Sequence, residues 1–143
     1  MKFTLGILLS FFFSSLYSQT GSKMDILIHG IRNTKGHVLI AVFRSADGFP
    51  DKKEKAFLRE RLPASAGTMS IQLKDIPAGK YAIAVIHDEN DNLQLDTGLF
   101  GIPKEGFCFS NNAMGTFGPP SFESASFYFG LSTSPRILNI SYW

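Results

Sequence analysis

Side chains that carry oxygen gather in one short stretch, residues 88–96, directly after the most strand-like segment of the chain. Calcium takes about six to eight oxygen ligands, so carboxylates and carboxamides at alternate loop positions are typical of a calcium site. The candidate ligands are Asp88, Asn90, Asn92, Gln94 through its backbone carbonyl, Asp96 and Glu105. The same residue types also form Asx turns, in which the side chain accepts a hydrogen bond from a loop amide. Both interpretations remain open, and calcium is the one cofactor that the sequence predicts.

The spacing departs from the helix-loop-helix calcium hand at two positions. If Asp88 takes the first position of that loop, Leu93 stands where a glycine makes the turn. Leu99 then stands where a bidentate glutamate completes the ion's ligands. The helix-loop-helix hand is therefore rejected, and if the loop binds calcium it projects from a strand and binds weakly, with a Kd of about 10⁻⁴ to 10⁻³ M.

Aromatic residues and glycines crowd the next segment, residues 97–121, which shows no clear period. Such a segment can line a groove for a sugar or a peptide, or it can pack onto the body of the domain, which is the interpretation we favour. If the groove forms, its ligand would meet His87, Lys104, Phe107, Phe109, Asn111, Asn112 and Phe117.

Motifs of the common enzyme classes are missing from the sequence, including G-x-S-x-G, the P-loop, H-E-x-x-H and the dinucleotide fingerprint. The enzymatic alternative is a small periplasmic hydrolase, because paired carboxylates can serve glycoside hydrolysis. Its candidate residues are His87, Asp88, Asp96 and Glu105. The single cysteine, Cys108, is expected to be a small buried side chain.

Alternation of apolar and polar residues predicts most of the secondary structure. Strands are expected at 24–28, 38–43, 69–74, 80–86, 122–129 and 136–143. Both alternating sets of residues 38–43 and 80–86 are apolar, so these two strands should lie inside a sheet with both faces covered.

One segment, residues 51–62, departs from this alternation. Asp51 and Glu54 have the spacing of a capping box, and Leu58 and Leu62 lie four residues apart, as on one face of a helix. The segment is therefore predicted to form a short helix that ends before a proline.

Short strands joined by Gly- and Pro-rich turns predict an all-β fold. We expect an antiparallel β-sandwich of about six to seven strands, with one short helix and one long Gly/Phe-rich loop. A small closed barrel is the rival architecture.

Residues 1–18 have the pattern of a secretory signal peptide, in which Lys2 precedes an apolar run that ends in serines. The remaining chain, residues 19–143, is expected to be a single domain that is exported to the periplasm or secreted. It contains no second apolar stretch long enough to span a membrane. The formal net charge of only +2 gives no reason to expect nucleic acid as a partner.

Three groups of motifs follow one another along the chain. They are IPAGKYA at 76–82 with HDEN at 87–90, GIPKEG at 101–106 with FSNN at 109–112, and FGPPSF at 117–122. With these motifs the chain resembles a family of exported bacterial proteins known as domain of unknown function 2141, from Ile26 to Tyr142. The resemblance implies a fold and an exported location, and it supplies no catalytic residues.

Residues 73–85 also resemble the turn and strand of transthyretin-like and carboxypeptidase-regulatory-like sandwiches. Domains of that kind tend to be accessory or binding modules. The resemblance therefore favours a binding or accessory module for an unknown small molecule, a glycan or an envelope protein. A structural protein of the cell envelope is the remaining alternative.

Overall fold

The computed structural model describes residues 22–130, 132 and 134–143, so the predicted signal peptide at residues 1–18 lies outside the described residues. Within this part of the chain there are eight strands and four short helical turns. In order they are β1 (Ser22–Ile31), β2 (His37–Phe43), η1 (Lys53–Lys55), β3 (Leu58–Pro63), β4 (Gly67–Ile76), β5 (Gly79–Asp88), η2 (Leu99–Gly101), β6 (Gly106–Phe109), η3 (Ser110–Asn112), α1 (Phe122–Ala125), β7 (Phe127–Phe129) and β8 (Arg136–Asn139). The prediction of a β-rich chain is confirmed.

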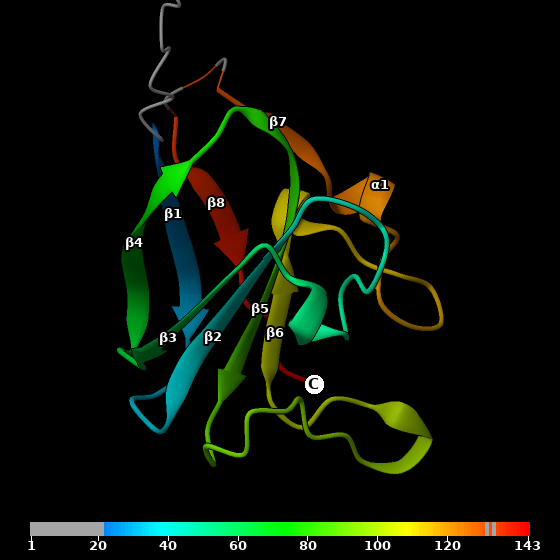
Figure 1. Ribbon diagram of the computed structural model, residues 1–143. Helices are drawn as coiled ribbons and strands as arrows, with labels where there is room; N and C mark the ends of the chain where they lie inside the picture. The colour runs from blue at the N-terminus through cyan, green and yellow to red at the C-terminus, as the bar shows by residue number, and fades with distance from the viewer. Residues whose placement is uncertain (1–21, 131, 133) are drawn as a thin grey trace, which may run out of the picture.

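The strands of the described residues form two sheets rather than one closed sheet. The first sheet has the order β4-β1-β8, and the second has the order β3-β2-β5-β6, with β7 paired to the start of β5 (Figure 1). All pairs are antiparallel except one, because β8 runs parallel to β1. The expectation of a purely antiparallel fold is therefore corrected to one mixed and one antiparallel sheet.

The main core lies between the two sheets. Ile26 and Ile28 of β1 face it from the first sheet, and Ile40 of β2 and Ile83 of β5 face it from the second. Each of these side chains is at most 1% exposed, so each contributes about 1.5–3 kcal/mol of hydrophobic stabilisation. Cys108 is buried in the same core, as expected, and burial raises the pKa of its thiol to about 12.

A second apolar cluster covers part of the outer face of the second sheet. Ala82 and Ala84 of β5 pack there beneath Phe49, Phe109 and Phe122. The central strand β5 is therefore covered on both faces, as the sequence predicts for residues 80–86. Strand β2 is also internal, between β3 and β5, and its inward side chains are buried, but Leu39 and Ala41 on its outer face are only partly buried.

The helix predicted at residues 51–62 does not form. A single 3-10 turn at Lys53–Lys55 is followed by β3, which pairs antiparallel with β2. Residues four apart share a face in a strand as well as in a helix, so Leu58 and Leu62 reach the core between the sheets from either conformation. Pairing with β2 decides between the two, because it satisfies backbone groups that β2 would otherwise leave open at the sheet edge.

The second half of the chain differs from expectation in three further places. The long segment 97–121 contains β6, a four-residue strand that is too short to show a period. The strand expected at 122–129 begins instead with α1, whose first turn is capped by the Ser121 side chain. The last strand ends at Asn139. No helix in the described part of the chain is long and apolar enough to cross a membrane.

Candidate functional site

The oxygen-rich loop leaves the end of β5, and two buried carboxylates hold it in place. The first is Asp88, whose side chain is fully buried. Its two oxygens accept hydrogen bonds from the backbone amides of Asn92, at 3.1 Å, and Leu93, at 2.9 Å. A charged acceptor with two amide donors makes strong hydrogen bonds, so Asp88 fixes the first turn of the loop.

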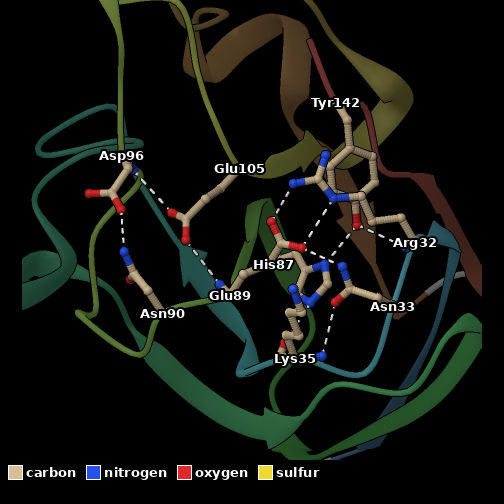
Figure 2. Close-up of polar contacts among 9 residues, drawn as sticks. All are labelled: Arg32, Asn33, Lys35, His87, Glu89, Asn90, Asp96, Glu105 and Tyr142. Atoms are coloured by element: carbon tan, nitrogen blue, oxygen red, sulfur yellow. Dashed lines mark hydrogen bonds and ion pairs between the residues drawn. The ribbon is translucent and has the colours of Figure 1, made fainter.

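The second buried carboxylate is Glu105, which is 4% exposed and precedes β6. One oxygen accepts a hydrogen bond from the amide of Glu89, at 2.9 Å, and the other accepts one from the amide of Asp96, at 3.1 Å (Figure 2). Glu105 therefore joins the beginning and the end of the loop to the next strand. We refer to Asp88 and Glu105, with the four amides that they bind, as the loop anchor.

The remaining predicted calcium ligands bind one another. Asp96 accepts hydrogen bonds from the carboxamide nitrogens of Asn90 and Asn92, at 2.5 and 2.7 Å. The carboxamide oxygens of Asn90 and Asn92 accept from the amides of Asn92 and Gln94. These are the contacts of Asx turns, the second interpretation of the sequence. In the described residues no three His, Cys, Asp or Glu side chains converge as a metal site.

His87 lies in the interior, at the end of the inward face of β5. Its Nε2 lies 2.8 Å from the carbonyl oxygen of Lys35 and its Nδ1 lies 2.7 Å from the hydroxyl of Tyr142 (Figure 2). A carbonyl only accepts, so in the neutral ring Nε2 donates and Nδ1 accepts from Tyr142. Both ring nitrogens are occupied, and His87 ties β5 to the turn after β1 and to the C-terminal segment.

Two glycines allow these close contacts. A side chain at Gly36 would place its Cβ 1.9 Å from the carbonyl oxygen of Asp88, and one at Gly106 would lie 2.4 Å from the ring of Tyr142. Gly36 also has a φ of +62°. Without a side chain at Gly36 the turn after β1 can approach the end of β5, and without one at Gly106 the ring of Tyr142 can lie against β6.

An ion pair closes the outside of this region. The carboxylate of Glu89 binds the guanidinium of Arg32 and the carboxamide of Asn33, and Arg32 also lies 4.4 Å from the centre of the Tyr142 ring (Figure 2). These donors lower the pKa of Glu89 to about 2 from an ordinary value of 4.5. Burial raises the pKa of Tyr142.

A polar cavity of about 540 Å³, which we call the end cavity, opens beside these residues. It is lined by Arg32, Asn33, Lys35, Glu89, Asn90, Asp96, Lys104 and Glu105. Of the four hydrolase candidates, only Asp96 and Glu105 border it, and their oxygens hold loop groups. His87 and Asp88 do not line this cavity, so the four side chains do not face one common solvent-accessible site.

The seven residues expected to face a ligand in the Gly/Phe-rich segment are not brought together. Lys104 borders the end cavity, and His87 is enclosed. Asn111 donates to the carbonyls of Ser124 and Ser126, while the side chain of Asn112 accepts from the amide of Asn139. Phe117 is fully exposed. The other two, Phe107 and Phe109, form part of a different surface.

That surface is a groove of about 700 Å³ on the outer face of the second sheet, which we call the outer groove. Its floor comes from β2, β5 and β6, and its walls come from the segments 50–53 and 93–95. Lys53 donates a hydrogen bond of 2.9 Å to the carbonyl of Leu93, so the two walls meet. The lining residues are Leu39, Ile40, Ala41, Pro50, Asp51, Lys53, Arg59, Glu60, Arg61, Ala84, Val85, Ile86, Leu93, Gln94, Leu95, Phe107 and Phe109.

Sequence reasoning found Phe107 and Phe109 and missed the rest of this groove. Arg59 and Arg61 enter it only because residues 58–63 are a strand, which places both on the face opposite Leu58 and Leu62. The sequence did contain one signal for the groove. The outward-facing residues of β2 are also apolar, which indicates that another part of the chain, or a ligand, covers this face.

The chain matches a family model described as an uncharacterized protein conserved in bacteria, domain of unknown function 2141, over residues 26–136. The chain therefore belongs to this family, and the resemblance inferred from the motifs is confirmed. No curated protein and no solved structure shows significant similarity to the chain.

Proposed function

We propose that this bacterial family member is an exported β-sandwich, of the transthyretin-like or immunoglobulin-like kind, that acts as a binding module with its ligand in the outer groove. The observation that carries the proposal is the groove itself. Its volume of about 700 Å³ falls in the range of about 300–1,000 Å³ that small-molecule sites occupy.

The shape of the groove follows from small side chains in the middle of the sheet. Ala41 and Ala84 are register partners in β2 and β5, and neither fills the space above the floor. Larger apolar side chains, Leu39, Ile86 and Leu95, are only partly buried around them. Apolar surface that remains partly open to water favours an apolar ligand, at about 25 cal/mol for each Å² that the ligand covers.

A titration with the neutral fluorophore N-phenyl-1-naphthylamine tests this proposal on the mature chain, residues 19–143. We expect enhanced fluorescence with the wild-type protein and a loss of at least about tenfold in affinity with Ala41→Trp, because the indole would occupy the groove. Ser70→Trp, on an exposed position of β4, is the matched control and should bind normally. Absence of binding to the wild type, or equal binding by both variants, would refute the proposal.

A calcium site in the 88–96 loop is a second candidate. In its favour, Asp88 and Glu105 are buried carboxylates that pair with no Lys, Arg or His among the described residues. Thermal melts in chelator and in millimolar calcium, with magnesium as the control, test it. Calcium at about 100 times its Kd adds about 2.7 kcal/mol, which raises Tm by several degrees. Asp96→Asn should abolish that rise, and identical melts of the wild type would exclude the site at that concentration.

Export is tested separately by expressing the full chain and sequencing the N-terminus of the protein found outside the cytoplasm. The signal peptide pattern predicts a mature chain that begins close to Gln19. An intact Met1 in the cytoplasmic fraction would contradict this part of the proposal.

A further inference from the structure

We propose that the outer groove is specific for anionic amphiphiles, in which a carboxylate or a similar acidic head meets Arg59 and Arg61 and an apolar body lies across the sheet towards Phe107 and Phe109. This inference rests on the proposed binding function and adds to it the chemical class of the ligand.

The register of the second sheet arranges the groove in two parallel rows. In one row Arg59, Ala41, Ala84 and Phe109 are successive partners across β3, β2, β5 and β6. The other row, two residues along each strand, contains Arg61, Leu39, Ile86 and Phe107. Both rows therefore begin with a guanidinium, pass over aliphatic side chains and end at an aromatic ring.

The length of a row suits an extended hydrocarbon. Neighbouring strands lie about 4.8 Å apart, so the three steps from β3 to β6 span about 14 Å. A ligand with one polar end and an apolar body of that length reaches from the arginines to Phe107 and Phe109, which line the other end of the groove and are each 8% exposed. A compact polar ligand such as a sugar would not reach that aromatic end.

The charges at the β3 end are only partly neutralised within the protein. Arg59 forms no ion pair and no side-chain hydrogen bond with any described residue. Arg61 lies 3.2 Å from both Asp91 and His37, so one carboxylate already occupies part of its guanidinium.

The other charged residues that line the outer groove do little to weaken its preference for an anionic head. Lys53 binds a carbonyl rather than a carboxylate. Glu60 lies between the two arginines in β3, so strand alternation places it on the opposite face. Asp51 belongs to the wall formed by residues 50–53, and it forms no ion pair with Arg59 or Arg61. The head of a ligand at the β3 end therefore meets two guanidiniums, which bind carboxylates with paired N–H donors.

The test compares decanoate with 1-decanol, two probes with the same chain and different heads, by isothermal titration of the mature protein below their aggregation limits. We expect decanoate to bind at least about tenfold more tightly than 1-decanol at about pH 7. Arg59→Gln should reduce decanoate affinity severalfold, towards the level of 1-decanol, and leave 1-decanol binding unchanged. Lys104→Gln, which removes a charge from the end cavity, is the control and should retain the preference.

The outcomes separate this inference from the proposed function. Equal binding of both probes, unchanged in Arg59→Gln, would overturn the preference for an anionic head while leaving the groove a binding site. Loss of the preference in Lys104→Gln would also overturn it, since the head would then lie in the end cavity. Binding of neither probe would remove the proposed function together with this inference.

A second variant tests the same idea in the opposite direction. Asp91→Asn removes the carboxylate that competes for Arg61, and asparagine accepts the positive φ of 62° at this position. We expect decanoate affinity to rise severalfold, with no change for 1-decanol. A fall in decanoate affinity, or no change, would contradict the role given to Arg61.

Discussion

The loop anchor and the outer groove both involve the loop that follows β5, and they use their polar groups in different ways. In the anchor, each carboxylate oxygen of Asp88 and Glu105 accepts a hydrogen bond from a backbone amide. No buried side-chain nitrogen or oxygen among the described residues lacks a hydrogen-bond partner. In the groove, Arg59 has no partner within the described protein, and the apolar floor is only partly covered.

The difference indicates that the oxygen-rich loop 88–96 mainly stabilises the fold, while the outer groove, with fewer polar groups, is available for a ligand. Buried carboxylates whose oxygens already accept hydrogen bonds from amides cannot readily bind a substrate as well. A ligand that covers Arg59, by contrast, must supply a negative charge, because burying an unpaired guanidinium costs free energy. The two regions are also connected, because Asp88 holds the amide of Leu93, and Leu93 forms one wall of the groove.

Among the variants that distinguish the loop anchor from the outer groove, Glu105→Ala should have the largest effect on the free energy of unfolding. The change leaves the amides of Glu89 and Asp96 without their acceptor, so we expect the free energy of unfolding to fall by about 3 kcal/mol. Urea unfolding at about pH 7 measures it. The neighbouring Lys104→Ala is the control and should stay within about 0.5 kcal/mol of the wild type. Equal stability of both variants would show that the anchor is not structural.

A smaller and pH-dependent effect is expected for Glu89→Gln. At about pH 7 the loss of the charged hydrogen bonds to Arg32 and Asn33 should lower the free energy of unfolding by about 1–2 kcal/mol. The pKa of Glu89 is depressed to about 2 from 4.5, so its contribution is fully present above that ordinary value and disappears as the pH falls towards 2. Unfolding of both proteins across this range should show the two stabilities converge, and a constant difference would contradict the assignment.

The smallest effect should come from Lys53→Ala, which removes the contact between the two walls of the groove. We expect stability to change by less than about 1 kcal/mol and the affinity for N-phenyl-1-naphthylamine to fall about threefold to fivefold. Lys52→Ala, one residue away, is the matched control. Unchanged affinity in Lys53→Ala would mean that the walls do not need this contact to hold a ligand.

Much of the fold could be predicted because the central strands carry their own signal. The two apolar sets of 38–43 and 80–86 indicate burial on both faces, and β2 and β5 lie at the centre of the second sheet. The edge strand β3 could not be recognised, since Leu58 and Leu62 satisfy helical and extended spacing equally. Four-residue β6 shows no period, and its place depends on pairing with β5, which is distant in sequence.

The candidate site was predictable in location and ambiguous in role. Asp88, Asn90 and Asp96 have the spacing that a calcium loop and a series of Asx turns both require, because the same oxygens can accept from amides or bind a cation. Only the folded structure brings particular groups together, and here the amides and carboxamides occupy these oxygens. The groove depends on a strand, β3, that the sequence assigned to a helix, so Arg59 and Arg61 could not be placed in its lining.

The central claim is that ligand binds in the outer groove and not in the end cavity, and the most direct test is an amide chemical-shift titration of the ¹⁵N-labelled mature protein with decanoate. We predict shifts in β2, β3, the central part of β5 and residues 93–95, with the amides of Arg32, Lys35 and Lys104 unchanged. Shifts confined to those three residues and their neighbours would contradict the account, because they would place the ligand in the end cavity instead.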